Sequence, residues 1–276
     1  MVYMRRASVA GQFYAGDARS LRSQIEQCFE GPLGPGRVPS LGSGRRKIIG
    51  GVCPHAGYMY SGMVAAHFYA RLAEDGFPES FVIIGPNHTG RGSGLAIARD
   101  DFQTPLGIAR IDRELAKMLR KDLVDEDDEA HEYEHSIEVQ LPFLQYFKPD
   151  IKFVPICMGF QDYAAAVSVG KLIREAMQKK DIVVIASTDF SHYVPKDEAK
   201  RKDSMAIDAI TRMDAKGLFE VVRDEDISMC GYGPVMATLT ACEGGRAALL
   251  KYASSGDVHP MRDVVGYASV VIEKPH

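Results

Sequence analysis

The chain lacks several features that would point to common classes of protein. It has five cysteines, at positions 28, 53, 157, 230 and 242, but no Cys-x-x-Cys pair, which argues against a structural zinc ribbon. An odd number of scattered cysteines fits a reducing compartment better than a disulfide framework. No run of 18 apolar residues occurs, so no membrane span is predicted. The net charge of −4 and the pI near 6.1 argue against a nucleic-acid-binding surface.

We also expect no export signal. Arg5 and Arg6 are adjacent, as in a twin-arginine signal, but residues 7–14 are too polar and too short for the apolar region that such a signal needs. We therefore expect a cytoplasmic protein with no membrane and no nucleic-acid partner. With 46% hydrophobic and 25% charged residues, the 276-residue chain has the composition of a globular protein.

Apolar runs that resemble buried strands alternate with helix-like segments. We expect strands at about 47–52, 81–85, 152–157, 181–186, 247–253 and 266–272, with a hairpin-like region around 95–98 and 104–108. We expect helices at about 17–29 (with Asp17 as N-cap), 62–74, 112–121, 136–147, 163–179, 196–213 and 233–242. Residues 31–44 are rich in Gly, Pro and Ser and predict a loop. This order favours a single α/β domain over residues 1–276, with a central mixed, largely parallel sheet flanked by helices.

Polar groups follow three of these apolar runs at the point where each run ends. His55 comes after the first, His88 after the second, and Asp189 and His192 come after the run at 182–186. Ligands bind just outside the carboxyl ends of parallel strands, so neighbouring strands would bring these groups into one crevice. Neutral imidazole is the commonest protein ligand for metals, which predicts a metal site. The alternative for Asp189 or Ser191 is an N-cap of the helix that starts near residue 196.

Residues 131–135 (HEYEH) match the zinc-binding helix signature of many metalloproteases. The acidic run DEDDE at 125–129 precedes them, which is unlike the buried helix that holds such a site. We therefore expect His131 to be exposed and to share no metal with His135. The preferred interpretation starts at Glu134 and places His135 in the crevice, before a helix capped by Ser136 or Glu138.

Six spaced motifs together resemble those of the Memo family. They are RA at 6–7 with AGQFY at 10–14, PHAGYMYSG at 54–62, GPNH at 85–88, EHSIE at 134–138, STDFSH at 187–192 and CG at 230–231. The resemblance spans nearly the whole chain. Microbial members are often called AmmeMemoRadiSam system protein B, and the implied fold is similar to that of the class III extradiol dioxygenases, which are non-haem iron enzymes.

The resemblance implies metal ligands at His55, His88 and Cys230, with Asp189 and His192 beside them. A helix N-terminus is expected near Cys230, which would favour its thiolate. The dioxygenases use a carboxylate where this chain has Cys230. A thiolate moves the preference towards copper or zinc and away from the iron oxygenase arrangement, and a shared fold does not transfer an activity.

Two functional hypotheses remain open. In the first, the chain is a metal-dependent oxidoreductase of dioxygenase type with iron or copper, zinc being the third option. Its catalytic candidates are His192, Asp189 and His135, and its substrate-binding candidates are Tyr58, Tyr60, Asn87 and Glu138. In the second, it is a non-enzymatic binding module that captures a peptide or a metal ion, as in signalling. The family name also implies a functional link to a radical-SAM enzyme and an AMMECR-type protein.

Overall fold

The computed structural model describes residues 4–44, 46–121 and 123–275. Its strands are β1 Met4–Arg5, β2 Ile48–Cys53, β3 Ser80–Pro86, β4 Leu95–Ile97, β5 Asp101–Thr104, β6 Gly107–Ile111, β7 Asp125–Glu126, β8 Lys152–Met158, β9 Ile182–Ser187, β10 His192–Pro195, β11 Arg246–Ser254 and β12 Asp263–Glu273. Its α-helices are α1 Ala18–Glu30, α2 Met63–Asp75, α3 Arg113–Leu119, α4 Leu141–Phe147, α5 Tyr163–Met177, α6 Lys196–Thr211, α7 Ala215–Asp224, α8 Tyr232–Ala241 and α9 Ser255–Val258. A π-helical turn η1 spans Tyr58–Gly62, and 3₁₀ turns span η2 Glu129–His131 and η3 Glu138–Gln140.

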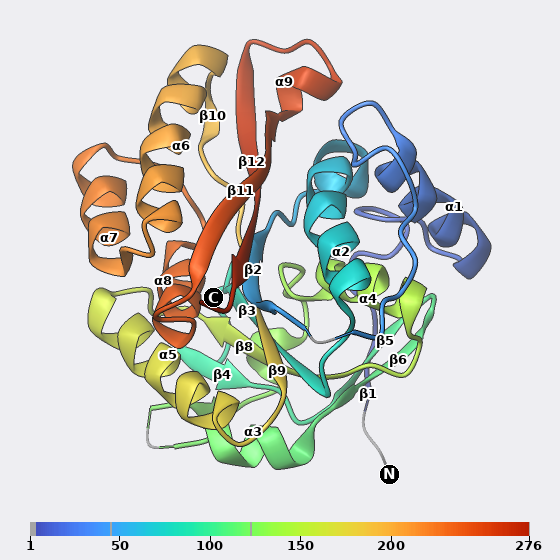
Figure 1. The fold of residues 1–276 in the computed structure, drawn as a ribbon, viewed down its shortest axis with the longest axis vertical. Coiled ribbons are helices and arrows are strands. Elements are labelled where there is room, and N and C mark those ends of the chain that lie inside the picture. The colour runs from blue at the N-terminus through green and yellow to red at the C-terminus, as the bar shows by residue number, and fades with distance from the viewer. Residues whose placement is uncertain (1–3, 45, 122, 276) are drawn as a thin grey trace.

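The strands join one mixed sheet whose middle is parallel (Figure 1). The order is β1-β5-β6-β8-β3-β9-β2-β12-β10, with β11 paired to β12 and β4 paired to β7 and β8. Neighbours from β6 to β2 run parallel, whereas β12 pairs antiparallel with β2, β10 and β11. The register aligns Cys53 with Ser187 and Ile84 with Ala186. The strands that precede His55, His88 and Asp189 are therefore neighbours and end at one edge, as the sequence predicts.

Helices cover both faces of the sheet because the central strands are apolar on both sides. Along β3, Val82 and Ile84 belong to the core that packs against α5, α7 and α8, while Phe81 and Ile83 belong to the core beneath α1, α2 and α4. All four side chains are at most 2% exposed. This uninterrupted apolar pattern is typical of strands buried on both faces. It produces the flanked α/β architecture expected from the sequence.

Several element predictions differ in detail. The hairpin is formed by β5 and β6, whereas β4 leaves it and pairs antiparallel with β8. The expected helix at 136–147 is a 3₁₀ turn followed by the shorter α4, which has Pro142 in its first turn. Helix α7 and strand β10 were not expected from the sequence. Asp17 does cap α1, with its carboxylate accepting from Ser20 N at 2.9 Å.

Among the described residues, no helix combines the length and the apolar character needed to cross a membrane.

Candidate metal centre

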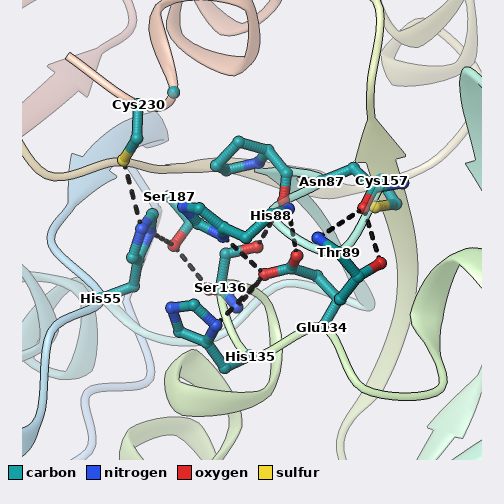
Figure 2. A network of polar contacts seen from close by, with 12 residues as sticks. His55, Asn87, His88, Thr89, Glu134, His135, Ser136, Cys157, Ser187 and Cys230 are labelled. Carbon is teal, nitrogen blue, oxygen red and sulfur yellow. Dashed lines mark hydrogen bonds and ion pairs between the residues drawn. The ribbon is translucent and has the colours of Figure 1, made fainter. Parts of the chain in front are cut away.

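Three histidines from distant parts of the chain meet at the carboxyl edge of the sheet. His55 follows β2, His88 follows β3, and His135 lies in the segment before η3. One possible ligand atom from each lies within 4.8 Å of the others. Figure 2 shows the three rings close together. The rings of His88 and His135 are stacked at 4.6 Å, and that of His55 stands nearly perpendicular to both, at 5.1 and 5.4 Å.

His55 is held rigidly in the interior. Only 2% of its surface is exposed. Its Nδ1 lies 2.9 Å from Ser187 Oγ at the end of β9, and its Nε2 lies 3.3 Å from Cys230 Sγ. Its backbone N–H donates to Asp189 Oδ1 at 2.9 Å. Burial, followed by the charges of nearby histidines, holds the pKa of His55 well below its usual range, so the imidazole is neutral and able to bind a metal.

Glu134 orients the other two histidines. Its carboxylate accepts from His88 Nδ1 at 2.9 Å and lies 3.5 Å from His135 Nδ1. Burial alone would raise the pKa of Glu134, but the hydrogen bond and charge of His88, the charge of His135 and a bond from Ser136 N together lower it to about 2. An ionised carboxylate behind a ligating imidazole fixes the ring orientation and raises its basicity. Since Nδ1 of His88 is engaged, its Nε2 is the atom left for a metal.

Cys230 borders the cluster, just before α8. Besides the contact with His55 Nε2, its Sγ accepts from the backbone N–H of Asp189 at 3.3 Å. Burial and the nearby Asp189 carboxylate raise the pKa of the Cys230 thiol. The expectation that the nearby helix N-terminus favours the Cys230 thiolate stays a prediction. A bound cation would have the opposite effect on the Cys230 thiol, because a thiol that coordinates a metal is deprotonated.

Asp189 and His192 flank this arrangement. Asp189 is 4% exposed, and burial raises its pKa to about 6. The alternative of an N-cap is wrong, since Pro195 occupies that position of α6. His192 is half-buried, and its Nδ1 lies 2.8 Å from the carbonyl oxygen of Ser228. That contact leaves Nε2 of His192 as the group that could exchange a proton with a ligand. The catalytic assignment of Asp189, His192 and His135 stays a prediction.

The four substrate-binding candidates have other partners. Tyr58 is buried and its hydroxyl donates to Val139 O, while the Tyr60 ring packs against His259. Asn87 ties its own loop together by donating to Arg91 O and accepting from Thr89. Glu138 is fully buried. It accepts from Arg5, Ser8 N, Ser8 Oγ, Val9 N and Tyr14. A ligand role for these residues stays a prediction. The expectation that Ser136 or Glu138 caps the following helix is wrong, because Ile137 is the N-cap of η3 and Gln140 that of α4.

The expected exposure of His131 is wrong. It is 2% exposed, its Nε2 contacts Ala96 O at 3.1 Å, and its ring packs against Phe102. The preceding acidic residues do lie at the surface, where Asp128 pairs with Arg99, but the chain turns inwards at η2 immediately afterwards. Burial lowers the pKa of His131 to about 4. Because η2 ends at His131, the HEYEH residues form no continuous α-helix, and His131 lies outside the histidine cluster, as predicted.

The sequence interpretation gave no role to three residues that support the cluster: Glu134, Ser187 and Gln140. Gln140 donates to Ser187 Oγ at 2.7 Å. Glu134 lies beside His135 in sequence, and Ser187 is the first polar residue after an apolar strand, which is a usable signal for a supporting residue. Gln140 has no such signal, because its contact depends on how the segment 136–140 packs over β9.

Fold and cluster together define an α/β protein with a candidate histidine-based metal centre at the carboxyl edge of its sheet. Residues 5–271 match the family model described as Memo-like protein. The chain belongs to the Memo family. It is 48% identical to a MEMO1 family protein of Methanosarcina mazei over 98% of this chain and 99% of that one. It is 49% identical to one of Methanopyrus kandleri, again over 98% and 99%.

A more distant likeness concerns the fold alone. The uncharacterized protein JW3007 of Escherichia coli K12 has a solved structure that is 14% identical to this chain. It superposes with a TM-score of 0.52 and covers 82% of this chain and 100% of its own. A similarity at this level supports the mixed α/β architecture and says nothing about the site.

Proposed function

We propose that this protein binds a transition metal ion through His55, His88 and His135, with Cys230 as a fourth donor. The observation that carries the proposal is the meeting of three imidazoles within 4.8 Å. Two of them are backed by hydrogen-bond partners, His55 by Ser187 and His88 by Glu134. Hydrogen-bond partners of this kind, which hold the ring nitrogen that does not bind the metal, are typical of protein metal sites. A chance cluster of histidines would not be expected to have them.

The distance between His55 and Cys230 suits a shared metal ion. For Zn–N near 2.1 Å and Zn–S near 2.3 Å in a tetrahedral site, the nitrogen and sulfur lie about 3.5 Å apart. The observed separation of His55 Nε2 and Cys230 Sγ is 3.3 Å. Imidazole and thiolate donors favour iron, copper or zinc over magnesium or calcium. About a third of the His88 side chain is exposed, at 33%, so the cluster is open to solvent on that side.

The identity of the metal decides between two functions. Six-coordinate iron would keep two positions free after binding four protein donors, which leaves room for a substrate and oxygen. We favour this arrangement, with iron or copper supplying redox chemistry for the oxidation of a small catechol-type molecule. His192 would then hold or release a proton through Nε2. A four-coordinate ion would instead be enclosed by the same donors, because structural zinc sites are closed. With four protein donors, such an ion would have no free position for a substrate. Metal binding without turnover is therefore the second candidate function.

Elemental analysis of protein purified without added metal tests the proposal first. Anaerobic titration with Fe(II), Cu(I) and Zn(II) should then give one ion per chain. We expect His55→Ala and His88→Ala to abolish tight binding, and Cys230→Ser to weaken it strongly, because a neutral hydroxyl replaces an anionic soft donor.

His192→Ala is the matched control, since this residue stands outside the cluster. It should retain the metal and lose oxygen uptake with a catechol probe. Unchanged affinity in His88→Ala would contradict the proposed centre. Tight binding of iron or copper without any oxygen uptake would favour the non-enzymatic candidate.

A further inference from the structure

A chain of buried hydrogen bonds runs from the interior to His55. Tyr69 hydroxyl donates to Gln140 Oε1 at 2.6 Å, and Gln140 Nε2 donates to Ser187 Oγ at 2.7 Å and to Pro54 O at 3.0 Å. Ser187 Oγ in turn donates to Ser136 O at 2.6 Å. Tyr69, Gln140, Ser136 and Ser187 are all at most 1% exposed, so no solvent competes for these bonds.

The directions of these hydrogen bonds determine which ring nitrogen of His55 carries the hydrogen. The Gln140 amide is oriented by two partners, since Tyr69 donates to its oxygen and Pro54 O accepts from its nitrogen. A serine hydroxyl has a single hydrogen, and that of Ser187 is directed to Ser136 O. The remaining contact of Ser187 Oγ, 2.9 Å to His55 Nδ1, can therefore form only if Nδ1 carries the hydrogen. In Figure 2, dashed lines connect His55 to Ser187 and Ser187 to Ser136.

We infer that Ser187 fixes His55 as the Nδ1–H tautomer, so that the lone pair of Nε2 faces Cys230. The hydrogen bond from Gln140 orients the Ser187 hydroxyl for this role. Ser187 is thus a positioning residue. The opposite tautomer would place an N–H on Nε2, where a metal has to bind, and would leave Ser187 Oγ facing an unprotonated Nδ1 without a hydrogen between them. In a buried site such a loss is unfavourable, because a polar group that loses its hydrogen bond there is not compensated by water. The Cys230 sulfur, 3.3 Å from Nε2, lies where a thiol hydrogen can be donated to that lone pair.

The inference gives the metal centre a specific property. Neither a change of tautomer nor a ring flip is needed at His55 before an ion enters, so this ligand is preorganised. Preorganisation of this kind depends on the supporting residues around a ligand. The importance of Ser187 for metal affinity rests on the proposed function, whereas the tautomer of His55 does not.

The tautomer is measured directly in metal-free protein. In wild-type protein labelled with nitrogen-15 at histidine, at a pH where the imidazoles are neutral, His55 should show a protonated Nδ1 and an unprotonated Nε2. A His55→Gln variant assigns the signal. A wild-type His55 with hydrogen on Nε2 would overturn the inference, whatever the protein does with metals.

Variants then test the role of Ser187. Ser187→Ala should lose the dominance of the Nδ1–H form and bind metal about 10–100-fold more weakly, the usual effect of losing a supporting group. Ser187→Thr, which keeps the hydroxyl, should restore both. The control is Ser269→Ala, which removes an equally buried hydroxyl that has no hydrogen-bond partner among the described residues. Retention of the Nδ1–H form in folded Ser187→Ala would contradict the inference. Failure of wild-type protein to bind metal would contradict the proposed function alone.

Discussion

Tyr193 holds a backbone conformation that bulky residues rarely adopt. Its φ is 56°, its side chain is 79% exposed, and the pairing of β10 with β12 shifts register between His192 and Val194. A left-handed conformation costs a residue with a Cβ about 1–2 kcal/mol. Because the exposed ring buries little surface, packing within the described residues does not explain this cost. The strained residue lies in β10, directly after the catalytic candidate His192.

We predict that Tyr193→Gly is more stable to urea than Tyr193→Ala, by about 1 kcal/mol. Both variants lose the ring, but only alanine keeps the strained Cβ. At an ordinary strand position the order is reversed, because glycine destabilises strands relative to alanine. Equilibrium unfolding in urea measures the difference, and an alanine variant at least as stable as the glycine variant would show that no strain is stored there.

Some site residues could be predicted from the local sequence and others could not. His55 and His88 were predictable because each directly follows an apolar run, and the position of a strand end depends on local sequence. The burial of His131 was not predictable, because the turn at η2 and the packing on Phe102 depend on distant parts of the chain. Cys230 was identified only through the family resemblance, since the chain around it gives no local signal.

Strand β2 depends on close packing of α2 against its backbone. A Cβ added at Gly51 would lie 2.1 Å from Phe68 Cε2 and 2.6 Å from Val270 O, on strand β12. Neither neighbour can move easily, because Phe68 is fully buried and Val270 O belongs to a sheet backbone. The glycine therefore allows the helix and the sheet to approach each other at the strand that leads to His55.

We predict that Gly51→Ala lowers the free energy of unfolding by about 1–3 kcal/mol, the usual cost of overpacking a core. The matched control is Gly44→Ala, because a Cβ at Gly44 would have no neighbour within 4 Å. Thermal unfolding of the two variants beside the wild type measures the effect. Equal stability of all three would mean that α2 can shift freely on the sheet.

At the level of elements, the sequence predicted the parallel core well and its edges poorly. Strands β2, β3 and β9 are continuous apolar runs, which mark strands buried on both faces. Strand β10 was not predicted because it has only 4 residues, ends in Pro195 and shifts its register between His192 and Val194. The pairing of β4 with β8 could not be predicted from local pattern, since the partner lies more than fifty residues along the chain and only the assembled sheet selects it.

The proposed donors connect four segments of the whole chain. His55 follows β2, His88 follows β3, His135 precedes η3, and Cys230 precedes α8. In the unfolded chain these groups are far apart, so binding one ion to all four there would cost the entropy of closing long loops. A ligand that binds only the folded state stabilises it by about 2.7 kcal/mol when its free concentration is a hundred times its dissociation constant.

We therefore predict that the ion bound most tightly in titration raises the melting temperature of the metal-free protein, and that a chelator reverses the rise. His88→Ala should melt at a temperature that does not depend on metal, because the cluster loses a ligand from β3. His67→Ala is the control: His67 is half-buried, contacts Leu33 O, and lies outside the cluster, so its variant should respond as the wild type does. Calorimetry with and without the ion measures the shift. A rise of equal size in His88→Ala would place the stabilising ion elsewhere on the molecule.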